Sequence, residues 1–332
     1  MTRTRVAVLG VTALALVASL APARAQQPSG AAPQASPTPS PQPAPTPAIK
    51  PFTLEVTVDV VSVTAVVFDK AGHPVRGLTP KDVDLYENGV KQQVSYFREA
   101  SSLGDPSERV PLSVVLVLDN SGSMRPNMSF LQEAVLSFVY KLEDVDTALL
   151  VSFNDTVKGS AEFTGDTDRL ERFVESMQAW GGTSLYDAIH YSLERIKDAP
   201  GRKALVVFTD GDDTTSQMVD KDVVEYARMV EATVYTIGFR GMGFMGSGPK
   251  GFLRKIATET GGQYFAPDKI GELIKVFNAI SNELKNHYLL AYTPTHEPDG
   301  TWREIALKVN RPDTEVRVRK GYFSVKRRRQ AD

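Results

Sequence analysis

The sequence predicts an α/β protein in which a doubly wound, mostly parallel sheet is flanked by a small β-sandwich. Between residues 111 and 284, apolar runs of strand length alternate with amphipathic segments of helix length, a pattern typical of a parallel sheet covered by helices on both faces. On either side of this region, period-2 patterns rich in β-branched residues predict antiparallel strands. The strands of each outer region would expose unpaired edges alone, so we expect them to form one sandwich together.

The order of strands and helices in the central region points to the place of a binding site. Strands are expected near 112–118, 147–153, 204–209, 232–238 and 263–265. Helices are expected near 127–142, 167–178, 185–197, 219–230, 250–260 and 268–284. Ligands of such sheets bind beyond the carboxyl ends of the strands. The loops that follow these strands are therefore the expected place of a site.

The sandwich strands are expected within residues 52–100 and 286–325. A period-2 pattern over 52–68 changes phase near its middle, which predicts a strand with a bulge or bend. Residues 83–86 and 92–97 are predicted to form a hairpin, because Asn88-Gly89 between them is a strong turn signal. The second region is expected to contribute strands over 287–293, 302–309 and 315–320.

The N-terminal segment, residues 1–25, has the features of a secretory signal peptide. Arginines near its start precede an apolar run, and small residues lead to Ala25, after which we expect cleavage. The apolar run over 6–20 is shorter than the about 20 residues of a membrane-spanning helix, although an uncleaved N-terminal anchor is the alternative. Residues 26–51 are rich in Pro, Ala, Ser and Thr and predict an extended linker. The mature chain is therefore expected to be secreted, periplasmic or part of the cell envelope.

Composition excludes several classes of protein. The chain has no cysteine, so neither disulfides nor a lipid-modified cysteine can stabilise or anchor it. The net charge of −2 becomes −5 once the three arginines of the signal segment are removed, and nucleic acid would need a basic face instead. The basic tail over 326–332 is interpreted as a solvated end of the chain, although it could touch anionic lipid.

Three motifs place oxygen-bearing side chains at the ends of predicted strands. The first is Asp119-Asn120-Ser121-Gly122-Ser123, which follows the apolar run 112–118. The second is the loop 181–185 with Thr183, and the third is the strand 204–209 that ends at Asp210. Hard cations such as Mg²⁺ prefer oxygen ligands and retain water, which suits hydroxyls combined with a few carboxylates. The alternative is that the two aspartates are helix caps and turn formers.

In this order, the three motifs resemble the metal-ion-dependent adhesion site of the von Willebrand factor type A (VWA) domain. The resemblance covers about half of the chain, within a domain of residues 108–285, and similar three-part arrangements occur in secreted bacterial proteins related to this domain. It implies that Ser121, Ser123 and Thr183 hold Mg²⁺ directly, while Asp119 and Asp210 act directly or through water. Mn²⁺ or Ca²⁺ could take the place of Mg²⁺. One coordination position would be left for an Asp or Glu of a partner protein.

These observations predict a binding or adhesion module that uses a divalent cation to bind an acidic residue of another protein. The alternative is a structural or assembly component of the bacterial envelope whose metal is purely structural. No enzymatic activity and no small-molecule substrate are expected, because the histidines are scattered, cysteine is absent, and the serines of the first motif have no adjacent base. A metal-assisted hydrolase is the weakest of the alternatives.

A glycine-rich segment over 241–246 matches the spacing of a dinucleotide-binding fingerprint. We do not interpret it so, because it follows a late strand and carries bulky apolar residues. Flexible Met-rich surfaces suit adaptable binding, so Met242, Phe244 and Met245 are predicted to contact the partner. The alternative is that these side chains pack into the core.

Overall fold

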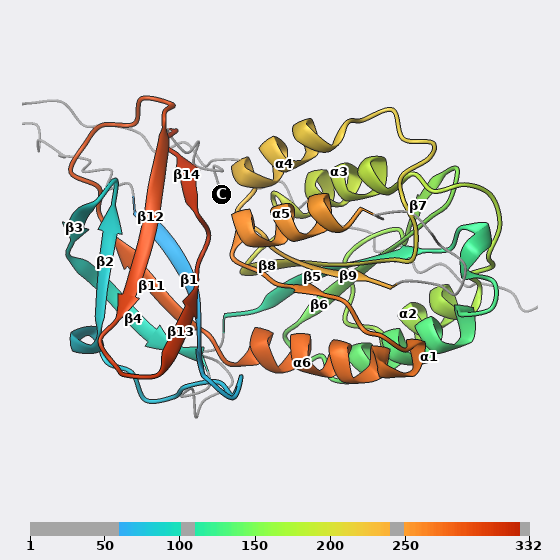
Figure 1. The fold of residues 1–332 in the computed structure, drawn as a ribbon, viewed down its shortest axis with the longest axis horizontal. Coiled ribbons are helices and arrows are strands. Elements are labelled where there is room, and N and C mark those ends of the chain that lie inside the picture. The colour runs from blue at the N-terminus through green and yellow to red at the C-terminus, as the bar shows by residue number, and fades with distance from the viewer. Residues whose placement is uncertain (1–59, 101–109, 240–248, 326–332) are drawn as a thin grey trace, which may run out of the picture. The chain divides into compact units, whose positions relative to one another are not determined.

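The structure is a computed structural model, and it describes residues 60–100, 110–239 and 249–325 (Figure 1). The predicted signal peptide, linker and basic tail lie outside the described residues, as do Met242, Phe244 and Met245. Of the predicted strand 52–68, the part before residue 60 also lies outside them. Within the described ranges, no helix is both long and apolar enough to cross a membrane.

A six-stranded sheet forms the centre of the larger region, with the order β10-β9-β8-β5-β6-β7. Its strands are β5 (Leu112–Asp119), β6 (Thr147–Phe153), β7 (Val157–Gly159), β8 (Arg202–Thr209), β9 (Thr233–Gly238) and β10 (Tyr264–Phe265). All pairs are parallel except β6 with β7, a short strand that the sequence did not predict. Every residue of β5 is buried, because it has strands on both edges and helices on both faces.

Helices cover the two faces of this sheet (Figure 1). One face carries α1 (Met128–Val139), α2 (Thr167–Glu175) and α6 (Leu273–Lys285), which follows the short turn η5 (Ile270–Glu272). The other carries α3 (Leu185–Ile196), α4 (Asp220–Met229) and α5 (Lys250–Thr260). Side chains of β5 alternate between the two cores, Leu116 entering one and Val117 the other. The doubly wound α/β prediction is confirmed.

The smaller region is a pair of four-stranded antiparallel sheets with the orders β13-β1-β11-β4 and β14-β12-β2-β3. The strands that precede the central sheet in the sequence are β1 (Val61–Asp69), β2 (Val83–Glu87), β3 (Val90–Gln92) and β4 (Val94–Glu99). The short turn η1 (Pro80–Asp82) comes directly before β2. Strands from after it are β11 (Tyr288–Tyr292), β12 (Trp302–Val309), β13 (Thr314–Arg317) and β14 (Gly321–Phe323). Val63 and Leu85 share one core with Leu290 and Ile305, so the predicted sandwich of N- and C-terminal strands is confirmed.

The predicted hairpin is wrong in its second strand. The turn at Asn88-Gly89 forms as expected, with φ of 47° and 78°, and it joins β2 to β3. The strand expected over 92–97 is interrupted at Gln93, and β4 then pairs with β11 in the other sheet. Alternation of polar and apolar residues predicts a strand but not its partner, and this segment crosses from one layer of the sandwich to the other.

The strands of the central sheet define two opposite edges. We call the end at which β5, β8 and β9 finish the carboxyl edge, and the end at which they begin the amino edge. The amino edge lies against the sandwich, where Arg319 pairs with Glu231 at 2.8 Å and the Lys320 amide donates to the Glu259 carbonyl at 3.1 Å. The carboxyl edge faces away from the sandwich (Figure 1).

Candidate metal centre

Neighbouring strands β5 and β8 create a crevice at the carboxyl edge. The chain leaves β5 towards α1 on one face of the sheet and leaves β8 towards α4 on the other face. Adjacent connections that diverge in this way open a space between the strand ends, which is the usual ligand position in such sheets. Asp119 is the last residue of β5, and Asp210 directly follows β8.

The side chains predicted as metal ligands lie together at this crevice. The Ser121 amide donates to Asp119 Oδ1 at 2.8 Å, which turns the chain back over the strand end. Ser121 Oγ lies 3.0 Å from Ser123 Oγ, and Ser123 Oγ donates to Asp210 Oδ1 at 2.7 Å. Ser123 sits in the short turn η4 (Gly122–Met124) and is exposed, whereas the carboxylates and Ser121 are buried.

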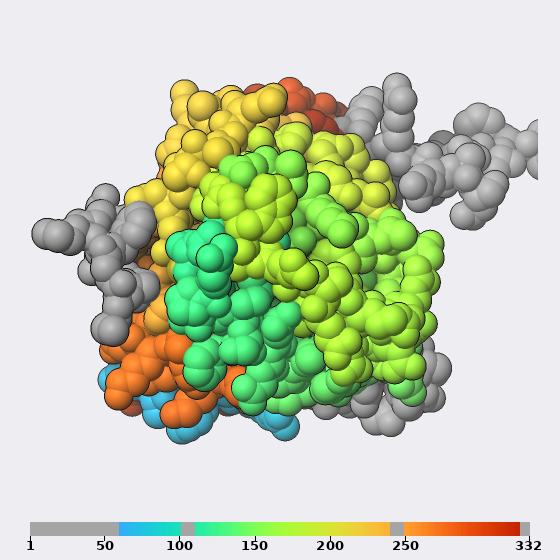
Figure 2. Space-filling view, turned by 90° about the vertical axis from the view of Figure 1, so that its right-hand side faces the viewer, coloured from blue at the N-terminus to red at the C-terminus, as the bar shows by residue number. Residues whose placement is uncertain are grey.

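The loop with Thr183 is fastened to the first motif by its backbone. The Gly122 amide donates to the Gly181 carbonyl at 3.0 Å. A Cβ added to Gly211 would lie 3.9 Å from Thr183 Oγ1, so this hydroxyl lies beside the turn that follows Asp210. Figure 2 shows the surface of the carboxyl edge, where the segments around residues 120–130 and 180–190 lie side by side. The fold therefore brings all three motifs to one place.

Both carboxylates of the crevice are buried, and the described part of the chain places no positive charge against them. Asp119 is fully buried, and this burial raises its pKa to about 6. Hydrogen bonds from Ser121 and Thr209 lower the pKa but do not cancel the effect of burial. Burial also raises the pKa of Asp210, which is 8% exposed. Within the described residues, neither forms an ion pair with Lys, Arg or His. Buried anions without a counter-charge are costly, so the site favours a bound cation.

The donor atoms suit a small, hard cation. All side-chain donors are oxygens. The separations of 3.0 Å and 2.7 Å between Ser121, Ser123 and Asp210 oxygens are close to those of neighbouring ligands on Mg²⁺, about 3.0 Å for octahedral bonds of about 2.1 Å. No group of three or more His, Cys, Asp or Glu able to hold a metal occurs in the described part of the chain. A metal here would thus depend on hydroxyl and water ligands.

Supporting residues around the crevice were missed from the sequence. Thr209 donates to Asp119 Oδ2 at 2.6 Å, and Asp155 Oδ1 accepts from the Gly182 amide at 2.7 Å. Gly181 has φ of +75°, and a Cβ there would collide with the Asp155 carboxylate. Thr209 ends a predicted strand and Asp155 follows another, so the argument from strand ends could have found both residues.

Two further polar or aromatic side chains define the surroundings of the crevice. Asp213, downstream of Asp210, accepts from the Tyr186 amide at 3.2 Å and so fixes the start of α3. Trp180 directly precedes Gly181, and half of its side chain is exposed, 51%. A large aromatic ring left in solvent beside a polar crevice is a candidate contact for another protein.

Comparison with known proteins agrees with this architecture. Residues 113–279, half of the chain, match the von Willebrand factor type A domain. The chain belongs to this family.

Relatives of this VWA protein match between about half and three quarters of the chain. The inter-alpha-trypsin inhibitor heavy chain H4 of Sus scrofa is 27% identical over 194 residues, which is 53% of this chain and 20% of that protein. The von Willebrand factor A domain-containing protein 3A of Homo sapiens is 24% identical over 222 residues, 63% of this chain and 18% of that protein. A von Willebrand factor type A structure from Catenulispora acidiphila covers 73% of this chain and 62% of its own, with 17% identity and a TM-score of 0.48. The chain thus spans about a fifth of the length of these curated relatives.

Proposed function

We propose that this VWA protein binds another protein through a divalent cation held at the carboxyl edge by Asp119, Ser121, Ser123, Thr183 and Asp210. The observation that carries the proposal is the pair of buried carboxylates, which no basic side chain of the described residues neutralises, next to hydroxyls at an edge open to solvent. VWA domains commonly bind a divalent metal at such a site, and Mg²⁺ is the expected ion, with Mn²⁺ or Ca²⁺ as alternatives.

Charge and geometry at the site define what the partner must offer. Asp119 and Asp210 balance a divalent charge without exceeding it, and the serine and threonine hydroxyls add oxygen atoms but no charge. An Asp or Glu of the partner would complete the metal's coordination shell with one more oxygen. The site would then carry a net negative charge, which it lacks before the partner binds. Ser123 is exposed, so this ligand would approach from solvent on that side. Trp180 would contribute apolar contact area next to it.

We propose binding without catalysis. The four histidines lie on other elements: His73 near Asp69, His190 against Tyr226, His287 beside Arg202 and His296 against Glu87. Ser121 Oγ contacts Ser123 Oγ, which donates to Asp210, and neither hydroxyl contacts a nitrogen base of the described residues. This arrangement supports ligand binding and gives no support to a nucleophile activated by a base.

We also propose that the protein acts outside the cytoplasm, in the periplasm, at the cell envelope or as a secreted protein. The support is the sequence of residues 1–25, with its charged start, short apolar run and small residues before Ala25. Sequencing of the mature N-terminus tests the predicted cleavage, which should leave residue 26 as the first residue. A chain that keeps residue 1 would instead have an uncleaved anchor or an unprocessed N-terminus.

The test of metal-dependent binding combines a direct and an indirect measurement. Titration calorimetry with Mg²⁺ measures the site itself, and capture of partners from an envelope extract by the immobilised full chain measures its use. Chelator and Thr183→Ala should both abolish capture, and added Mg²⁺ should restore it only in the unaltered chain. Thr156→Ala is the matched control, because Thr156 lies after β6 and, of the residues that the structure describes, bonds only Asn154. Capture that survives both chelator and Thr183→Ala would favour assembly through the sandwich instead.

A further inference from the structure

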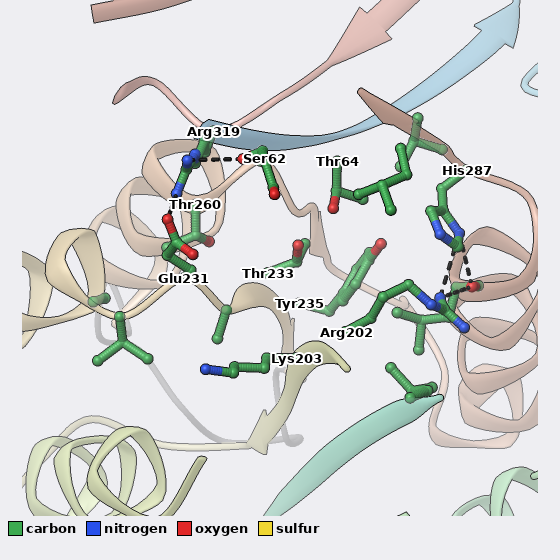
Figure 3. A pocket seen from close by; sticks show the side chains of 18 of the residues that line it. Ser62, Thr64, Arg202, Lys203, Glu231, Thr233, Tyr235, Thr260, His287 and Arg319 are labelled. Atoms are coloured by element: carbon green, nitrogen blue, oxygen red, sulfur yellow. Dashed lines mark hydrogen bonds and ion pairs between the residues drawn. The ribbon is translucent and has the colours of Figure 1, made fainter. Parts of the chain in front are cut away.

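A cavity of about 390 Å³ lies at the amino edge between the central sheet and the sandwich (Figure 3). Strand β1 forms one wall, the first residues of β8 and β9 form the opposite wall, and the C-terminal ends of α4, α5 and α6 lie around it. Cavities that bind small molecules commonly have volumes of about 300 to 1,000 Å³ and often occur between domains. Its size therefore admits a small organic molecule.

The acidic residues around this cavity are already neutralised. Each is paired with an arginine: Glu231 with Arg319 at 2.8 Å, Glu259 with Arg228 at 3.0 Å, and Glu283 with Arg317 at 2.7 Å. These pairs tie the end of each helix to its surroundings and leave no excess of negative charge. The cavity thus offers no reason to bind a cation.

Arg202 is the positive charge that these pairs do not balance. Its Nε donates to the Val110 carbonyl at 3.2 Å and its Nη1 to the Leu284 carbonyl at 2.6 Å, while no carboxylate oxygen of the described residues lies within 4.0 Å. Nη2 has no hydrogen-bond partner among those residues. Burial lowers the pKa of Arg202, and the negative charge of the more distant Asp146 partly opposes this shift. The guanidinium nevertheless stays protonated, as it does in proteins generally.

His287 adds no charge to this end of the cavity. Its Nδ1 lies 3.3 Å from Arg202 Nη1 and 3.1 Å from the Leu284 carbonyl. Burial, together with the Arg202 charge, lowers the pKa of His287 to about 3, so the ring is neutral near pH 7. The cavity consequently carries on Arg202 a positive charge that no carboxylate of the described residues balances, whereas Lys203, which also lines it, donates to the Lys197 carbonyl.

Hydroxyl groups converge on the same space from both walls. Ser62 and Thr64 belong to β1, and Thr233 begins β9. None of these hydroxyls forms a hydrogen bond with the described residues. Figure 3 shows them pointing into the space between β1 and β9, with Arg202 at one end. Such groups can exchange hydrogen bonds with hydroxyls of a ligand, because each both donates and accepts.

We propose that this interdomain cavity binds a small hydroxylated carboxylate, such as a sugar acid. Its carboxylate would accept from Arg202, and its hydroxyls would bond Ser62, Thr64 and Thr233. A single negative charge balances the single unpaired guanidinium, whereas a phosphate dianion would leave one charge in excess. This site is at the opposite end of the sheet from the metal centre and does not depend on the function proposed there.

The test is titration calorimetry and thermal unfolding of the full chain with D-gluconate or D-glucuronate. Chelator is present throughout, so that these carboxylates cannot bind through a metal at the carboxyl edge. Sorbitol serves as the neutral control, and inorganic phosphate as the anion without hydroxyl-bearing carbon. We expect at least one of the two sugar acids to bind and raise the unfolding midpoint, with sorbitol and phosphate at least tenfold weaker. If neither acid binds at concentrations up to about 10 mM, the proposal is overturned. A dissociation constant of that size corresponds to a binding free energy of only about −2.7 kcal/mol.

Variants then assign the site to Arg202 and its neighbours. Arg202→Met should weaken binding at least tenfold, whereas Arg169→Met, at an exposed arginine on α2, should leave it unchanged. Should Arg202→Met not fold, Ser62→Phe provides the second variant, since Ser62 is exposed on β1 and a phenyl ring there would fill the cavity. Unchanged binding to either folded variant would show that the acid binds elsewhere and would refute the assignment.

Discussion

The two edges of the central sheet carry opposite, uncompensated charges. At the carboxyl edge, Asp119 and Asp210 are buried with no basic partner in the described ranges, and hydroxyls of serine and threonine lie beside them. At the amino edge, Arg202 has no carboxylate within reach in the described residues, and hydroxyls again lie nearby. A charge removed from water without a partner is unfavourable, so each edge indicates the sign of the ligand that would stabilise it.

The edges also differ in what can reach them. The carboxyl edge consists of loops that face solvent, with Trp180 and Ser123 exposed, so a macromolecule could approach it. The amino edge is covered by the sandwich, and its cavity of about 390 Å³ admits only a small molecule. The same sheet can therefore present a protein-binding site at one end and a small-ligand site at the other.

The largest effect is expected from removing a carboxylate of the carboxyl edge. Asp119→Ala should lower Mg²⁺ affinity at least a hundredfold, about 2.7 kcal/mol, because a buried negative charge leaves the site. Stability without metal should hardly fall, since burial already opposes the ionised form of Asp119. Calorimetric titration with Mg²⁺ and urea unfolding measure both. Asp212→Asn, two residues after Asp210 in the turn that follows β8, is the control, and equal Mg²⁺ binding by the two variants would remove Asp119 from the site.

Lowering the pH should reduce the stability of the folded protein through His287 at the amino edge. The folded protein keeps this ring neutral down to a pKa of about 3, whereas the unfolded chain takes up the proton near pH 6.5. Its contribution to stability is therefore complete above pH 6.5 and is lost as the pH falls towards 3, by about 2 kcal/mol at pH 5. In His287→Gln, urea unfolding between pH 7 and 5 should lack this loss. Parallel pH profiles for variant and parent would show that the ring is not kept neutral.

The loop with Thr183 should depend on glycine at position 181. Gly181→Ala forces a side chain into a left-handed conformation and against the Asp155 carboxylate, so we expect a loss of about 1 to 2 kcal/mol in unfolding free energy and weaker Mg²⁺ binding. Gly72→Ala is the matched control, because Gly72 also has positive φ but a Cβ there meets nothing within 4 Å. If both variants lose the same stability and keep Mg²⁺ affinity, contact with Asp155 has no effect on the site.

Trp180 provides the smallest and most selective test of the carboxyl edge. Trp180→Ala should reduce capture of a protein partner about tenfold, near 1.4 kcal/mol, because an exposed aromatic contact is lost. Mg²⁺ affinity and the unfolding midpoint should stay the same. Phe130→Ala, at another exposed aromatic residue on α1, is the control. An equal loss of capture in both variants would indicate a general apolar effect and not a defined contact.

Much of the carboxyl edge followed from the sequence. The run that becomes β5 is apolar without interruption, which predicts a buried parallel strand, and Asp119 comes at its end. The same reasoning placed Asp210 after β8 and Thr183 in a loop before α3. These signals are local, because a strand and the loop that follows it are neighbours in the chain. Their role as metal ligands stays a prediction.

Local patterns predicted most of the strands and helices, though not β7, and the polar residues at the strand ends, because such patterns extend over only a few residues. Tertiary structure alone decided that β4 leaves β3 to pair with β11, since partner choice depends on distant segments. It also decided that, among the residues the structure describes, Asp119 has no positive partner and Arg202 no negative one. The cavity at the amino edge unites Ser62, Arg202 and Thr233, which no spacing in the chain connects. Whether a charge is balanced is a property of the space around it, and that space exists only after the chain has folded.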